Sequence, residues 1–105
     1  MSTASLDLIG SLPSQMLYMV IEHFKNRDAA AIYKRFRERG RMAPEGLKYI
    51  DSWVETNFDR CFQLMECDDK ELFEQWIENW KDLADFEIVE VRTSKEASAL
   101  MAGQA

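Results

Sequence analysis

The chain has 105 residues, a formal net charge of −6 and a sequence pI of about 4.8. This length fits one domain, which on folding should bury roughly two-thirds of the surface that the unfolded chain exposes. The acidic balance argues against binding to nucleic acid or to an anionic membrane surface, because both call for cationic residues. The composition, 47% hydrophobic and 30% charged, indicates a globular protein.

Residues 1–15 are rich in serine and contain a short apolar patch that ends at Pro13. They have no positively charged start and no long apolar run, so we expect neither a signal peptide nor a membrane span. The sequence therefore predicts an N-terminal extension over 1–15, outside the main domain, and a cytoplasmic protein.

The first half of the domain reads as a strand, a helix and another strand. The apolar and β-branched run 16–24 predicts the first strand. The stretch 29–39 predicts a helix, with Asp28 as its N-cap and Gly40 at its end. After a Pro/Gly loop, residues 47–55 predict the second strand.

The second half repeats the alternation. Residues 60–67 predict a third strand that forms a hairpin with the second. The D-D-K-E pattern that begins at Asp68 predicts a capping box, and helical spacing of apolar residues continues to Leu83. Residues 86–92 predict the fourth strand, and residues 94–105 a C-terminal tail with a short helix.

The order β-α-β-β-α-β is the ferredoxin-like arrangement. It predicts an α+β domain over 16–93, in which one antiparallel sheet carries both helices on the same face. The other face of the sheet is then left uncovered.

Strand side chains alternate between the two faces of a sheet, and the two sets differ here in character. One set is mainly aliphatic, and we expect it under the helices. The other mixes aromatic and polar groups, and we expect it to line a cavity between two sheets that pack across a two-fold axis. This candidate ligand-binding pocket comprises Tyr18, Glu22, Tyr49, Asp51, Trp53, Gln63 and Met65.

Three side chains are candidates for acid–base chemistry. His23 is the only histidine, but it ends a strand, where a surface or core role is more common. Glu22 and Asp51 have apolar strand neighbours, and for them a functional role and structural pairing are equally open. The aromatic residues of the pocket are also open to two interpretations, a wall for a flat ligand or anchors of a dimer interface.

Cys61 and Cys67 are the only cysteines. On one strand they would lie about 20 Å apart, so we expect two free thiols, buried as small apolar side chains. No C-x-x-C pattern, zinc motif or glycine-rich phosphate loop is present, so we expect no metal site and no cofactor.

Four segments resemble a known family: MLYMVIEHFK, FRERGRMAPEGLKYIDSWVE, RCFQLMECDD and LADFEIVEVRTS. Over residues 16–94 the chain resembles the bacterial domain-of-unknown-function family 3303, which is similar to the dimeric α+β-barrel proteins. The resemblance implies the ferredoxin-like fold of a dimeric α+β barrel and a homodimer through the open sheet face. It implies no activity and no catalytic residue.

The sequence leaves two main functions open. The first is a homodimeric domain that binds a small hydrophobic or aromatic molecule, or a protein partner, in or near the inter-sheet cavity. The alternative is a small cofactor-independent enzyme, monooxygenase- or isomerase-like, with Glu22, Asp51 or His23 in a water-excluded pocket. A weaker third is an interaction protein that uses the acidic face of the second helix. We favour the first because no nucleophile–base pair is recognisable.

Overall fold

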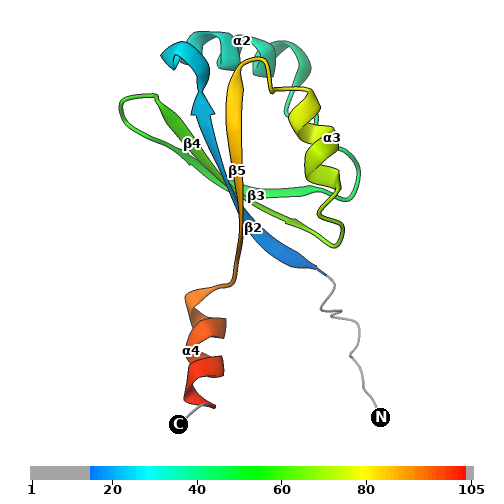
Figure 1. Cartoon of the computed structure of the whole chain (residues 1–105), viewed down its shortest axis with the longest axis vertical. Helices are drawn as coiled ribbons and strands as arrows, with labels where there is room; N and C mark the ends of the chain where they lie inside the picture. Colours follow the sequence, from blue (N-terminus) through cyan, green and yellow to red (C-terminus); the bar gives the residue numbers. More distant parts are fainter. Residues whose placement is uncertain (1–14, 104–105) are drawn as a thin grey trace.

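A computed structural model describes residues 15–103. Figure 1 shows a twisted sheet with two helices packed on one side and a third helix that points away from the sheet at the C-terminal end. The predicted N-terminal extension lies outside the described residues, apart from Gln15. The elements in chain order are β2 (Met16–Phe24), the short 3-10 helix η1 (Lys25–Arg27), α2 (Ala29–Arg39), β3 (Lys48–Val54), β4 (Arg60–Cys67), α3 (Leu72–Glu78), β5 (Ala84–Val91) and α4 (Ser94–Ala102).

The sheet has the strand order β3-β4-β2-β5, and every neighbouring pair is antiparallel. The hairpin strands β3 and β4 lie together on one side of β2, with β4 paired to β2 and β3 at the edge, and β5 pairs with the other side of β2. This is the split βαβ topology of the ferredoxin-like fold. The predicted α+β class and the placement of both helices on one face are confirmed.

Local signals fix α2 as the sequence predicts. The Asp28 carboxylate accepts a hydrogen bond from the Ala31 amide at 3.2 Å, which caps the first turn. At the other end Gly40 adopts φ 71°, a value that favours glycine, and its amide donates to the Phe36 carbonyl.

The second helix differs from its prediction. It begins at Leu72 rather than at Asp68, because Asp69 forms a turn instead of a cap: its carboxylate accepts from the Glu71 amide at 2.9 Å. The helix also ends at Glu78. Residues 79–83 continue as hydrogen-bonded turns, and β5 starts at Ala84, two residues before the predicted position.

The predicted assignment of the two sheet faces is wrong for β2 and β4, whereas on β3 Ser52 and Val54 lie under the helices and Asp51 and Trp53 lie on the open face, as predicted. The side chains of β2 that lie under the helices are Tyr18, Val20, Glu22 and Phe24, all buried. Leu17, Met19, Ile21 and His23 occupy the open face. The reason is that the helices themselves supply large aromatic side chains that pack against this mixed face.

Two aromatic contacts illustrate that packing. The rings of Tyr18 and Phe73 meet edge to face with centroids 5.0 Å apart, and those of Trp76 and Phe86 do so at 5.6 Å. Such pairs stabilise a core by about 0.5–1.5 kcal/mol beyond the area that they bury. The core therefore lies between the sheet and α3, and the polar side chains of the same face gather farther along the sheet, beneath α2.

Candidate ligand-binding cavity

A cavity of about 100 Å³ lies between the sheet and α2. Its walls come from β2, β3, β4, α2, the loop after α2, and α3 with the turn that follows it. Half of its lining side chains are apolar: Phe24, Ile32, Phe36, Val54, Trp76 and Trp80. The other half are polar or ionisable: Glu22, Tyr33, Arg41, Ser52, Cys61 and Gln63.

Glu22 lies on the central strand β2, between Cys61 of β4 and Phe86 of β5. Its side chain is only 5% exposed. Burial raises the pKa of the Glu22 carboxyl, and the opposing effects of hydrogen bonds from Gln63 and Cys61 and of the Arg41 charge are smaller. The environment therefore favours the protonated carboxyl more than water does.

Gln63 connects this carboxyl to a cation. The Arg41 Nε donates to the Gln63 Oε1 at 3.0 Å, which leaves the amide nitrogen of Gln63 to donate toward Glu22. Gln63 is itself 5% exposed, and this arrangement satisfies a polar group that burial would otherwise penalise. Arg41, Gln63 and Glu22 thus lie in a row along one wall of the cavity, with Gln63 between the cation and the carboxyl.

The Arg41 backbone is held from the other side of the core. Its carbonyl accepts from the indole nitrogens of both Trp76, at 2.9 Å, and Trp80, at 3.0 Å. Its guanidinium stacks over the Tyr49 ring, with 3.6 Å between the guanidinium carbon and the ring centroid. The backbone and the guanidinium of Arg41 are consequently both held in place.

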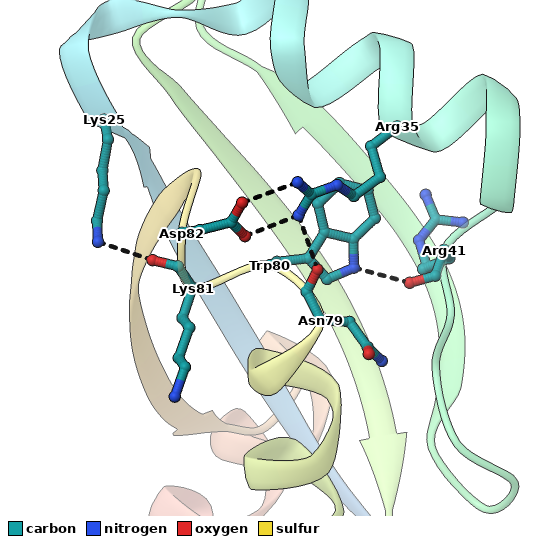
Figure 2. Close-up of polar contacts among 7 residues, drawn as sticks. All are labelled: Lys25, Arg35, Arg41, Asn79, Trp80, Lys81 and Asp82. Carbon is teal, nitrogen blue, oxygen red and sulfur yellow. Dashed lines mark hydrogen bonds and ion pairs between the residues drawn. The ribbon is translucent and has the colours of Figure 1, made fainter.

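Arg35 lies over the Trp80 ring, with 5.8 Å between the guanidinium carbon and the ring centroid, and forms an ion pair with Asp82 (Figure 2). Arg35 of α2 binds both carboxylate oxygens of Asp82, at 2.7 and 2.8 Å, and donates to the Asn79 carbonyl at 3.0 Å. The hydrogen bonds from Arg35, and to a smaller extent its charge, lower the pKa of Asp82 to about 2. This bidentate contact joins α2 to the turn after α3, and both segments contribute to the wall of the cavity.

The two thiols are free and buried, as predicted. Burial, and then the neighbouring Glu22 charge, raise the pKa of the Cys61 thiol to about 12. Cys61 is therefore a protonated donor in the cavity wall and not a thiolate nucleophile. Cys67 is fully buried at the other end of β4 and takes no part in the cavity.

The residues singled out from the sequence separate into three places. Glu22 and Gln63 line the cavity together, and Tyr49 lies at its edge against Arg41. Tyr18 and Met65 are buried in the core and do not line the cavity. Asp51 and Trp53 pair with Leu64 and Phe62 on the open face, and His23 is exposed on that face at the end of β2.

Sequence reasoning missed Arg41, Tyr33, Ser52 and Cys61. Cys61 and Gln63 are two residues apart on one strand and therefore share a face of the sheet. Cys61 pairs with Glu22, so this is also the face on which the Glu22 side chain lies. Among residues 15–103, no three His, Cys, Asp or Glu side chains are grouped so that they could hold a metal ion. Within the same range, no helix is long and apolar enough to cross a membrane.

Comparison with known proteins gives one family and one solved structure. The model of the family described as Domain of unknown function (DUF3303) matches residues 16–105. No curated protein matches the sequence. The solved structure is described as "Putative antibiotic biosynthesis monooxygenase from Bacteriodes thetaiotaomicron VPI-5482"; it is 13% identical, with a TM-score of 0.48, over 76% of this chain and 90% of that one.

Proposed function

We propose that this chain, which belongs to the DUF3303 family, binds a small, largely aromatic molecule in the cavity between α2 and the sheet. One observation carries the proposal: the buried Glu22 and Gln63, and Arg41, which donates a hydrogen bond to Gln63, line a cavity whose other walls are largely apolar and aromatic. Small-molecule sites combine apolar walls with a few fixed polar groups in this way.

The size of the cavity limits the ligand. A cavity of about 150 Å³ lined by apolar side chains is large enough to bind benzene. The cavity here, at about 100 Å³, is smaller than that, so a single ring would fit only with an outward movement of its walls. Trp76, Trp80 and Phe36 supply aromatic surfaces on which a flat ring would stack.

A second candidate function is acid–base catalysis on the same molecule. The observation that favours it is Glu22, a buried carboxyl with a raised pKa that lines the cavity. A carboxyl whose pKa is raised in this way can exchange a proton with a bound ligand. In this variant of the proposal Glu22 moves the proton, and Gln63 and Arg41 position the carboxyl.

The open face of the sheet supports a second part of the proposal, pairing with another copy of the chain. No described element covers this face, and Trp53 is 52% exposed on it. Two sheets packed face to face would bury the apolar side chains that it presents. These are Leu17, Met19, Ile21, Trp53, Phe62, Leu64, Val89 and Val91. The interface would then be separate from the ligand cavity, which lies on the other face.

The three tryptophans provide an internal test of ligand binding. Trp76 and Trp80 line the cavity, whereas Trp53 lies on the open face. In a titration with single-ring compounds followed by ¹H–¹⁵N NMR, the indole signals of Trp76 and Trp80 should shift with saturation, and that of Trp53 should remain in place.

A matched pair of variants sharpens this test. Val54→Phe should fill the cavity and abolish the shifts, because Val54 is part of its wall. Val89→Phe makes the same change on an edge strand of the open face and should leave them intact. Shifts that survive Val54→Phe, or that appear at Trp53 alone, would contradict the proposed site. If Glu22→Gln still binds the ligand but no longer converts it to product, the acid–base role of Glu22 would be favoured.

A further inference from the structure

We infer that the ligand carries a carboxylate or a similar anionic oxygen, and that Arg41 is the residue that selects it. This inference rests on the proposed function, because it concerns the chemistry of the molecule that would occupy the same cavity.

The first argument is the unused hydrogen-bonding capacity of Arg41. A guanidinium has five N–H donors, and within the described residues 15–103 the one on Nε alone has an acceptor, the Gln63 side chain. Within residues 15–103, neither terminal nitrogen donates to a protein acceptor, and no carboxylate forms an ion pair with Arg41. The four remaining donors form the planar fork that matches a carboxylate.

The second argument is that the fork is held in place before any ligand arrives. Stacking on Tyr49 fixes the plane of the guanidinium, and its hydrogen bond to Gln63 fixes the rotation within that plane. The two indole donors fix the backbone of Arg41. A group fixed in this way loses little conformational entropy when it binds, and this increases affinity.

The third argument is charge. The ionisable carboxyl that faces Arg41 within the cavity is Glu22, and burial disfavours its negative form. Cys61 and Tyr33 also remain neutral, because burial raises the pKa of the thiol and of the phenol. Among residues 15–103 no carboxylate forms an ion pair with Arg41, so the guanidinium lines the cavity without a direct anionic partner. A neutral ligand would leave that cation partly desolvated and unpaired, whereas an anion would pair with it.

The test compares two probes of nearly the same shape. Benzoate and benzamide differ in charge but not in ring size, and both suit a single-ring cavity. With dissociation constants from the Trp76 and Trp80 indole shifts, benzoate should bind at least about tenfold more tightly than benzamide.

Variants assign that preference to one residue. Arg41→Gln should abolish the preference, with benzamide affinity changed little, whereas Arg39→Gln removes one positive charge from the exposed end of α2 and should preserve it. Arg41→Lys keeps the charge but loses the fork, so it should reduce the preference several-fold. This third variant decides the matter if Arg41→Gln fails to fold.

The outcomes separate the two claims. Equal binding of benzoate and benzamide, or a preference that survives Arg41→Gln or is unchanged in Arg41→Lys, overturns the role of Arg41 and leaves the binding cavity standing. Failure of both probes to shift the Trp76 and Trp80 signals overturns the inference and the proposed function together.

Discussion

The helix-covered face and the open face of the sheet carry opposite mixtures of side chains. The covered face holds Glu22 and Gln63, both 5% exposed, whereas the centre of the open face is aliphatic at Met19, Ile21 and Leu64. A simple hydrophobicity rule would place the two sets the other way round. The comparison shows that a polar side chain can be buried beneath a helix when a neighbouring segment supplies a hydrogen-bond partner. The part of the core that holds these polar side chains also contains the cavity, unlike the aromatic part beneath α3.

The largest expected difference between the faces is in stability. Trp76 is 1% exposed and packs against Phe86, so Trp76→Ala should lower the free energy of unfolding by about 4 kcal/mol. Trp53 is 52% exposed, so Trp53→Ala should cost less than about 1 kcal/mol. Urea denaturation measures both, at a protein concentration where sedimentation shows single copies. Equal losses of unfolding free energy in the two variants would contradict the difference in burial between the two faces.

A smaller effect is expected on association. Leu64 lies on β4 at the middle of the open face, opposite Met19. Leu64→Glu places a charge in the proposed interface and should raise the dimer dissociation constant by at least about 100-fold. Sedimentation equilibrium measures this, with Leu100→Glu on exposed α4 as the control. A wild-type chain that stays monomeric at every concentration would rule out the open face as an interface.

The smallest effect concerns the buried carboxyl. The folded state raises the pKa of Glu22 above its ordinary value of 4.5, so between the two values the folded chain binds more protons than the unfolded one. Glu22 therefore contributes most to the free energy of unfolding below about pH 4.5, and this contribution is lost as the pH rises through the pKa of Glu22 in the folded state. The groups that face the carboxyl are Cys61, Gln63, Arg41 and Tyr33.

Glu22→Gln cannot ionise, so it should keep the stability that the wild type loses. At about pH 8 we expect it to be more stable by on the order of 1 kcal/mol, with the gap closing toward pH 4.5. Chemical denaturation at several pH values measures the gap, and Glu87→Gln on the open face controls for the loss of one charge. A gap that widens toward acid would show that Glu22 is stabilised as its anion.

Much of the fold follows from local signals. The third strand occupies 60–67, as its alternation predicts, and Asp28 and Gly40 bound α2 where their conformational preferences place them. The start of α3 was mispredicted, because the sequence offers two competing roles for the same Asp-Asp pair. A turn at Asp69 prevails over a cap at Asp68, and only the geometry of the chain leaving β4 distinguishes them.

The cavity could be predicted only in part. Glu22 and Gln63 are polar residues within otherwise apolar strands, and this is apparent from the sequence alone. Arg41 lies in a loop with other basic residues near it, and its role depends on Trp76 and Trp80, which are 35 and 39 residues away in the chain. No periodicity links these positions, so the site emerges only when the sheet and helices are brought together.

The central claim is that the cavity beneath α2, and not the open face, receives a small aromatic molecule. Crystals of the protein exposed to bromobenzene test this directly, because anomalous scattering from bromine locates the ring. The account predicts a bromine peak within the cavity between Ile32, Trp76 and Trp80. A peak confined to the open face around Trp53, or no peak within the cavity at saturating bromobenzene, would contradict it.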